Sequence, residues 1–258
     1  MVTRARTEAP GLMALLEERG ATAILAPAIE LVDAPDGPLD QAAKELREGG
    51  FAWVVFTSAA GVDALFRRLG GRGPSEVAAG TNAAAVGEGT ARALRDRGVE
   101  PALVPSTFTT DALGLAMPSG TGRVLLARAD IASDELDAAL AGKGWTPIRV
   151  DAYRTRLATE LPADADRALR EGRVHAVTFT SASTVHGFVG VAAKVWKAAP
   201  TRPRVVCIGP VTAAAARAAG MAVEAEARPH TIGGVVTALE RMFAEPITSG
   251  RAGPKARA

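Results

Sequence analysis

Two stretches of the chain show the same order of apolar, hydroxyl-bearing and helix-favouring residues. Residues 53–58 read Trp-Val-Val-Phe-Thr-Ser, and residues 176–181 read Ala-Val-Thr-Phe-Thr-Ser. Each stretch is followed by a helical pattern, so each predicts a buried strand of an α/β sheet and then a helix that a hydroxyl side chain caps. The two copies lie 123 residues apart, which indicates a repeat within the chain.

Further blocks recur at nearly the same distance. Gly87 and Gly209 stand in similar surroundings 122 residues apart, and the segment Thr-Arg-Ala at 3–5 is echoed by Ala-Arg-Ala at 127–129, 124 residues further on. A repeat of this length predicts two similar domains and excludes a solenoid of short units. The expected fold class is therefore α/β: two similar domains with parallel sheets flanked by helices.

Two segments of alternating apolar and polar residues separate the copies of the repeat. Residues 29–33 alternate in this way, and so do residues 146–155, in which Arg149, Asp151 and Tyr153 share one side. This alternation predicts that the domains are joined by a two-stranded ribbon. The expected parts are domain 1 at 1–28 plus 157–243, domain 2 at 38–149, ribbon strands at 29–37 and 150–156, and a basic, disordered tail at 244–258.

The remaining pattern predicts where individual elements begin and end. The first strand reads as the tail of a strand, which suggests a misplaced start or missing upstream residues. Thr109 and Thr231, 122 residues apart, are expected to open helices, and Ser133 is expected to cap the helix that carries Leu136 and Leu140. Further strands are expected at 21–27 and 101–105, and loops at 70–75 and 194–203.

Composition narrows the class of protein. Of 258 residues, 48% are apolar, 4% aromatic and 22% charged, which is enough for two cores built mainly from Ala, Val and Leu. The net charge is +2 and the folded part holds no dense basic block, so nucleic acid is not an expected partner. No export signal or membrane-spanning run is visible, and Cys207 is the only cysteine. We expect a cytoplasmic protein without membrane contact, intrachain disulfide or cysteine-based metal site.

Several predicted strands end in Gly, Ser or Thr directly before a helix. In an open α/β sheet ligands collect at such strand ends, where free N–H groups and the helix dipole favour anions. Two facing domains would offer such groups on both walls of a cleft. Each hydroxyl by itself is better explained as a helix cap, and only the four symmetric positions taken together favour anion binding. The residues concerned are Thr57, Ser58, residues 87–90, residues 180–183 and residues 209–212.

Other kinds of chemistry lack their usual residues. Gly-Glu-Gly at 87–89 misses the third glycine of a dinucleotide loop, and no glycine cluster is followed by a phosphate-binding lysine. The three histidines have no metal-ligand spacing, and Cys207 is expected to lie in a core. Tyr153, the only tyrosine, could donate a hydrogen bond to a leaving oxygen, or it could simply pack between the domains.

The residues at these positions resemble the uroporphyrinogen-III synthase family. The resemblance rests on the two Phe-Thr-Ser strand ends, Val-Gly-x-x-Thr-Ala at 86–91, Ile-Gly-Pro-Val-Thr-Ala at 208–213 and Ala-Tyr-Arg-Thr at 152–155, and it covers roughly residues 2–243. It implies a lyase without cofactor or metal, acting as a monomer on the linear tetrapyrrole hydroxymethylbilane. The product is uroporphyrinogen III, formed by ring closure with inversion of ring D through a spiro intermediate.

The resemblance also implies roles for individual residues. Tyr153 matches a tyrosine that helps the hydroxyl of ring A to leave, and is the expected catalytic residue. Val211 stands where some relatives have a second hydroxyl, which gives Thr212 more weight. The expected substrate-binding residues are Arg4, Ser58, Thr90, Arg128, Ser181, Ser183, Gly209 and Thr212.

Two other functions remain open at this point. Domains of this kind also occur fused to methyltransferases or to DNA-binding regulators, so the chain could be a non-catalytic module that senses tetrapyrroles or other anions. A two-domain protein that binds sugars or amino acids is a third reading, disfavoured because no export signal is visible.

Overall fold

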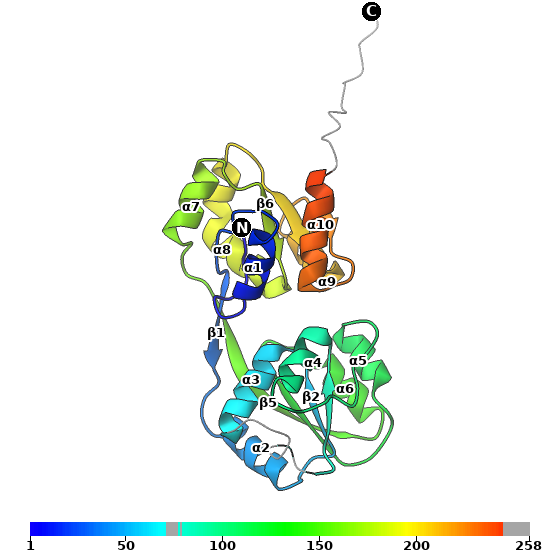
Figure 1. Cartoon of the computed structure of the whole chain (residues 1–258). Coiled ribbons are helices and arrows are strands. Elements are labelled where there is room, and N and C mark those ends of the chain that lie inside the picture. The colour runs from blue at the N-terminus through cyan, green and yellow to red at the C-terminus, as the bar shows by residue number, and fades with distance from the viewer. Residues whose placement is uncertain (71–76, 78, 245–258) are drawn as a thin grey trace, which may run out of the picture. The chain divides into compact units, whose positions relative to one another are not determined.

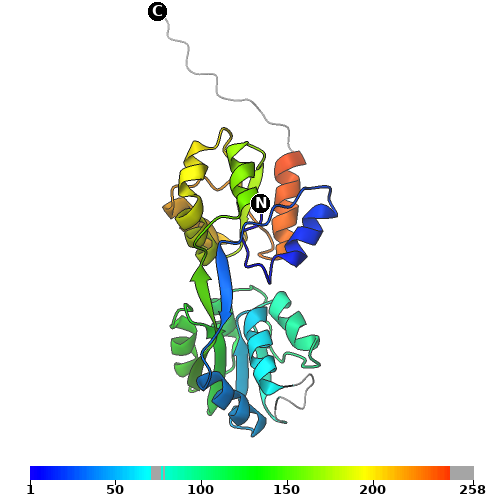
Figure 2. The same cartoon turned by 90° about the vertical axis from the view of Figure 1, so that its left-hand side faces the viewer.

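The computed structural model describes residues 1–70, 77 and 79–244, and it divides into two compact units. Unit 1 comprises Met1–Ile29 and Leu157–Ala258, and unit 2 comprises Glu30–Arg156. The chain thus leaves unit 1 within strand β1 (Ile29–Asp33) and returns to it within β5 (Thr146–Leu157). These two strands are hydrogen-bonded neighbours, and Figures 1 and 2 show them side by side. The α/β fold class with a two-stranded connection is confirmed.

Unit 2 is built on a five-stranded sheet of order β1-β5-β4-β2-β3. Strand β2 (Trp53–Phe56) pairs in parallel with both β3 (Asn82–Ala85) and β4 (Arg123–Ala129), and β4 pairs in parallel with β5. All four residues of β2 are buried, because helices cover both faces of the sheet. The strand β5 begins at Thr146, so the second ribbon segment is the end of a strand of this sheet.

The helices of unit 2 divide between the two faces of its sheet (Figure 1). The faces have separate apolar cores, one around Val54 and Phe56 and the other around Trp53 and Val55, as the alternation of side chains along a strand requires. The first core includes residues of α2 (Pro38–Arg47), α3 (Ala59–Leu69) and α4 (Glu88–Arg95), and the second includes residues of α5 (Thr110–Ala116) and α6 (Glu135–Ala141).

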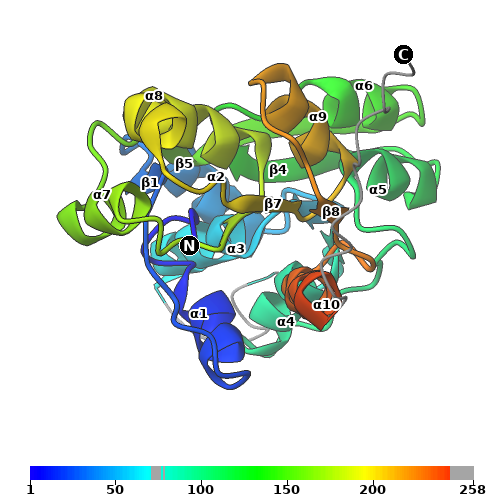
Figure 3. The same ribbon diagram turned by 90° about the horizontal axis from the view of Figure 1, so that it is seen from above.

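Unit 1 repeats this plan with fewer strands in its sheet. Its sheet has the order β6 (Ala176–Phe179), β7 (Arg204–Cys207) and β8 (Ala225–Glu226), all parallel. One core includes residues of α7 (Ala163–Arg170), α8 (Ala182–Ala198) and α9 (Pro210–Ala218); the other includes residues of α1 (Pro10–Glu17) and α10 (Ile232–Ala244). Figure 3 shows α1 and α10 on one side of β7 and β8, and α8 and α9 on the other.

The internal repeat is visible in the strand pairing of the two units. Val2 forms parallel bridges with Leu25 and Thr178 at the edge of the unit 1 sheet. In unit 2, Leu126 corresponds to Val2 and Val55 corresponds to Thr178, and Leu126 and Val55 likewise pair with each other, between β4 and β2. Val2 and Leu126 are separated by the same 124 residues as the Thr-Arg-Ala and Ala-Arg-Ala segments. The weak sequence echo therefore marks equivalent strands.

Four expectations for single elements are wrong. The segments 21–27 and 101–105 form only isolated bridges, at Leu25 and Leu103, in place of strands. The expected loop from residue 194 begins later, because Val195 and Trp196 are buried and continue α8 to Ala198. Ser133 does not cap α6; Asp134 precedes that helix, and the Ser133 hydroxyl donates to Glu135 at 3.0 Å.

Two expected features fall on residues that the structure does not describe, the loop at 71–75 and the tail from residue 245. The single residue Ala244, expected in the tail, ends α10. None of the described helices is both long and apolar enough to span a bilayer.

Candidate functional site

The carboxyl end of the unit 2 sheet joins Tyr153 to Ser58. Ser58 precedes α3, and its Oγ accepts the Gly61 N–H at 3.1 Å, so the hydroxyl caps this helix as expected. The same Oγ lies 3.0 Å from the Tyr153 hydroxyl, within hydrogen-bond distance. The only tyrosine and one of the predicted binding hydroxyls therefore form one connected pair.

Close packing between α3 and β4 brings the two residues together. β4 lies between β5 and β2, so Tyr153 reaches across it to a residue that follows β2. A Cβ atom on Gly61 would stand 2.7 Å from the Ala127 carbonyl oxygen, a contact too short for any other residue to make without displacing the backbone. Glycine at this position therefore allows the first turn of α3, which holds Ser58, to lie against the end of β4.

A second helix start in unit 2 holds Thr90. Gly87 is extended and precedes α4, and a Cβ atom there would lie 3.0 Å from the Phe108 side chain, which covers it. Thr90 is buried, with 5% of its surface exposed.

Unit 1 presents a matching pair of helix starts. Ser181 caps α8: its Oγ accepts the Thr184 N–H at 3.2 Å and lies 2.8 Å from the Ser183 Oγ. The expected hydroxyls at Ser181 and Ser183 thus adjoin one another. Since both still have free acceptor or donor capacity, they can contact an anion through the same cluster.

The other helix start in unit 1 combines Gly209, Thr212 and His230. A Cβ atom on Gly209 would lie 3.3 Å from the His230 ring, as Gly87 would approach Phe108. His230 Nδ1 lies 2.8 Å from the Ala227 carbonyl oxygen and 3.1 Å from that of Ile208, so its ring orders the loop beside the glycine. Thr212 is buried, like Thr90. Pro210 has no N–H, so this helix start offers fewer donors than that of α4.

Sequence reasoning missed Phe108 and His230 as covers of these glycines. A signal existed, because the two residues are also 122 apart and each precedes a threonine that opens a helix. Thr109 caps α5 by accepting the Ala112 N–H at 3.1 Å, and Thr231 accepts the Gly234 N–H at 3.0 Å. The repeat therefore includes the side chains that pack against Gly87 and Gly209.

The two expected substrate-binding arginines occupy equivalent places, and each binds an acid of its own unit. Arg4 contacts Glu8 at 3.0 Å, and Arg128 contacts Asp137 at 2.9 Å and the Ser133 carbonyl at 2.9 Å. Only 3% of the Arg128 side chain is exposed, and burial lowers the pKa of its guanidinium. This burial favours a structural role for Arg128, because its guanidinium bonds to Asp137 and Ser133 and not to Tyr153.

The remaining candidate chemistry of the sequence is accounted for by burial. Cys207 is fully buried in β7, and burial raises the pKa of its thiol to about 12, so it is a core residue as expected. Among the described residues, no three His, Cys, Asp or Glu side chains stand together as a metal site.

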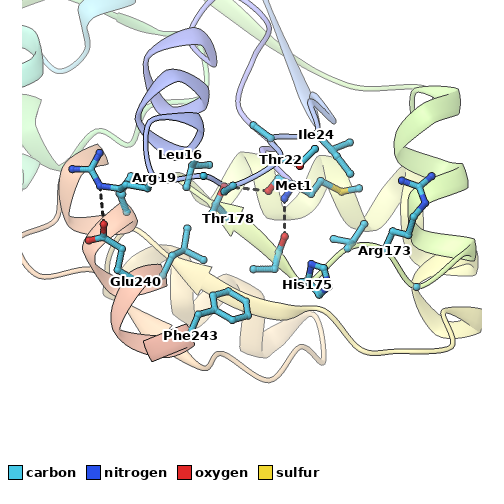
Figure 4. A pocket seen from close by; sticks show the side chains of 18 residues that line it. Met1, Leu16, Arg19, Thr22, Ile24, Arg173, His175, Thr178, Glu240 and Phe243 are labelled. Carbon is cyan, nitrogen blue, oxygen red and sulfur yellow. Dashed lines mark hydrogen bonds and ion pairs between the residues drawn. The ribbon is translucent and has the colours of Figure 1, made fainter. Parts of the chain in front are cut away.

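A cavity of about 860 Å³ lies in unit 1, at the other end of the strands (Figure 4). It is lined by Met1, Ala176 at the start of β6, and Phe243 of α10, among other mostly apolar side chains. Ligands of parallel α/β sheets collect at the carboxyl ends of strands, whereas this cavity adjoins their amino ends. We therefore assign the candidate site to the helix starts and not to the cavity.

The Met1 amine beside this cavity predicts a pH-dependent stability. It donates to the Ala176 carbonyl at 2.7 Å, and burial lowers its pKa from 8.0 to about 5. Between these pH values the unfolded chain binds a proton that the folded chain does not, so stability falls as the pH falls from 8 to 5. This lowering of the Met1 pKa corresponds to at most about 4 kcal/mol of unfolding free energy.

Urea unfolding at pH 8 and pH 5, on protein whose intact Met1 is verified by mass, measures this effect. N-terminally acetylated protein has no amine to titrate and is the matched control. The difference in unfolding free energy between the two pH values should be smaller for the acetylated protein. Equal differences would show that the amine stays charged in the folded state.

Comparisons with known proteins agree along nearly the whole chain. A family model described as uroporphyrinogen-III synthase HemD matches residues 11–237. The uroporphyrinogen-III synthase of Synechococcus elongatus is 29% identical over 250 residues, which cover 93% of the chain and 94% of that protein. The porphyrin biosynthesis protein HemD of Ruminiclostridium josui is 32% identical over 222 residues; the match covers 84% of the chain but 43% of that longer protein.

A solved structure shows the same fold. The crystal structure of a mutant uroporphyrinogen III synthase from Thermus thermophilus has a TM-score of 0.63 and 24% sequence identity, and covers 94% of the chain and 97% of its own. At this identity the likeness extends to the fold alone.

Proposed function

The chain belongs to the uroporphyrinogen-III synthase family, and from that premise we propose that it catalyses the family's reaction. The reaction closes hydroxymethylbilane to uroporphyrinogen III, with loss of water and inversion of ring D. The observation that carries the proposal is the Tyr153 hydroxyl, held 3.0 Å from Ser58 Oγ where ligands of such sheets bind. This hydroxyl can donate a hydrogen bond to the departing hydroxyl of ring A.

Ser58 acts on this step through Tyr153. Its Oγ already accepts the Gly61 N–H, and it is a neighbour of the Tyr153 hydroxyl. A serine so placed restricts the rotation of the phenol O–H. We therefore describe Ser58 as a positioning residue and the phenol as the catalytic group.

Each unit has helix starts that can bind carboxylates of the substrate. The first turns of α3, α4, α8 and α9 direct N–H groups and the positive end of the helix dipole towards the carboxyl ends of their sheets. The buried hydroxyls of Thr90 and Thr212, and the Ser181–Ser183 cluster, add hydrogen-bond donors. Because the linear substrate recloses readily once its hydroxyl has left, the protein mainly has to hold one conformation.

The proposal includes a reaction without cofactor, carried out by a cytoplasmic monomer. The alternative is a non-catalytic sensing module of the same fold, and no feature of the described residues favours it over the enzyme. The deciding experiment supplies the purified protein with hydroxymethylbilane and separates the product isomers. Type III product identifies the synthase; type I product alone, at the rate of spontaneous closure, would identify the sensing module.

A double replacement tests the anion-binding role of unit 1. We expect Ser181→Ala combined with Thr212→Ala to weaken binding of uroporphyrinogen III by roughly 100-fold or more, since each hydrogen bond to a charged group contributes about 1.5–3 kcal/mol. Equilibrium titration measures the affinity. Thr201→Ala is the control, because this hydroxyl donates to the Gly172 carbonyl at the amino end of the sheet. Unchanged affinity in the double variant would remove these hydroxyls from the binding site.

A further inference from the structure

Asp130, which follows β4, is bonded to the backbone of β5 at Tyr153 and again two residues further on, at Thr155. Its N–H donates to the Tyr153 carbonyl at 3.2 Å, and its carboxylate Oδ1 accepts the Thr155 N–H at 3.0 Å. Oδ1 also accepts the Ile131 N–H at 3.0 Å, which fixes the carboxylate within its own loop. We propose that Asp130 is the positioning residue that sets the place of Tyr153 in the reaction; this inference rests on the proposed function.

The pairing of the strands explains why such a residue is needed. The β4–β5 register shifts between Arg128 and Ala129, and the last paired residues are Ala129 and Tyr153. Beyond that pair β4 offers no further carbonyl to β5, although Thr155 still has an N–H to satisfy. The Asp130 side chain supplies the missing acceptor, as aspartate commonly does for nearby backbone N–H groups. Tyr153 therefore lies inside a hydrogen-bonded segment and not at a frayed strand end.

Arg149 keeps the Asp130 loop in place. Its Nη2 donates to the Ala132 carbonyl at 2.7 Å and to the Asp130 carbonyl at 3.2 Å, and its Nη1 contacts Asp134 at 2.6 Å. Arg149 belongs to β5, the strand of Tyr153, so the loop is bonded to this strand from two directions. The position of Asp130 is thus determined by the strand that it supports.

Tyr153 is consequently held at both ends, by Asp130 at its backbone and by Ser58 at its hydroxyl. A misplacement of about 1 Å at a reacting group can cost roughly 100-fold in rate. Loss of the backbone contacts alone leaves the hydroxyl bond, so the expected loss for Asp130 is smaller. This places Asp130 among the residues that determine the rate and the isomer ratio without touching the substrate.

Activity of Asp130→Ala and Asp130→Asn is the first measurement. We expect Asp130→Ala to lower kcat roughly 10-fold and to raise the share of type I product, while product affinity stays within about 2-fold. Asp130→Asn keeps an oxygen acceptor for the Thr155 N–H and should recover most of the rate. Asp36→Ala is the control, because this carboxylate is 89% exposed and pairs only with the Arg68 side chain in the described part of the chain.

The Tyr153→Phe background shows whether Asp130 acts through the phenol. We expect Asp130→Ala to cause little further loss of kcat in that background, since coupled residues are non-additive. Losses that simply multiply would overturn the inference.

The environment of Tyr153 can be followed without any turnover. Because Tyr153 is the only tyrosine, labelling with 3-fluorotyrosine gives a single fluorine NMR resonance. We expect this resonance to move or broaden in Asp130→Ala and to stay near its original position in Asp130→Asn and Asp36→Ala. An unchanged resonance in Asp130→Ala would refute the positioning role. If the resonance moves in Asp130→Ala but the wild-type protein makes no type III product, the proposed function is refuted and the contact between Asp130 and Tyr153 is still established.

Discussion

Gly187→Ala is expected to destabilise unit 1 strongly. A Cβ atom on Gly187, in α8, would stand 1.8 Å from the Ala28 carbonyl oxygen, which already accepts the Ala158 N–H at 2.9 Å. Either α8 moves away from the sheet, or the Ala28 peptide turns and leaves the Ala158 N–H without its partner. Overpacking costs about 1–3 kcal/mol and a lost buried hydrogen bond about 1–3 kcal/mol more. We expect a combined loss of about 4 kcal/mol, against a total of roughly 5–15 kcal/mol for a domain.

Thermal unfolding gives the measurement and the same helix gives the control. For a unit of this size about 4 kcal/mol should lower the Tm by about 10 °C or more. Gly190→Ala lies three residues further along α8, where an added Cβ atom meets nothing within 4 Å. That change should stabilise the protein by roughly 0.5–1 kcal/mol, because alanine favours helix more than glycine. Equal Tm values for the two variants would mean that α8 does not lie against Ala28 in solution.

The parts of the fold that the sequence predicts are those in which local pattern and burial coincide. Strands β2 and β6 are buried at every residue, so each reads as an apolar run, which only Thr178 of β6 interrupts. Their ends are marked by Ser58 and Ser181, which cap the next helices as predicted. Where burial is one-sided or pairing is brief, as at Leu25, the pattern could not separate a strand from a single bridge.

The candidate site was predictable in its members but not in its connections. The hydroxyls and Tyr153 carry local signals, because they lie at strand ends and in an alternating segment. Their hydrogen bonds depend on sheet order: Tyr153 reaches Ser58 only because β4 separates β5 from β2 by one strand. Asp130 had no local signal at all, since its role depends on the register shift just before it and on Thr155, which lies 25 residues further along the chain.

The burial of Arg128 is a second feature that the sequence could not predict. An arginine in a repeated segment favours recognition of an acidic substrate, and the repeat is real. However, Asp137 lies in the first turn of α6 and pairs with Arg128 at 2.9 Å inside unit 2. Replacing Asp137 would destabilise the protein more than the loss of an exposed ion pair, because the buried Arg128 charge would be left without its partner. Sequence pattern identified the equivalent positions without showing which partner each arginine has.

The Tyr153→Phe variant is expected to lower kcat by roughly 100-fold, at the lower end of the 10²–10⁴-fold that a positioned proton donor contributes. The phenol donates to the hydroxyl that leaves ring A, and this group also departs slowly unaided, so part of the rate survives. Phenylalanine keeps the ring that packs against the apolar core of unit 2, so the Tm and product affinity should change little. The change affects the transition state more than the bound ground state, which predicts a fall in kcat with a nearly constant KM.

The product isomers provide the stricter test of the same variant. Substrate that loses its hydroxyl outside the enzyme's control closes without inverting ring D, so slower catalysis should raise the share of type I product. Ser58→Ala leaves the phenol in place and removes only its neighbour at 3.0 Å, so this variant should lie between the wild type and Tyr153→Phe in both rate and isomer ratio. Single-turnover assays with separation of the isomers measure both quantities together. Full rate with only type III product from Tyr153→Phe would assign the tyrosine to packing, and the departure of the hydroxyl would then depend on the helix starts alone.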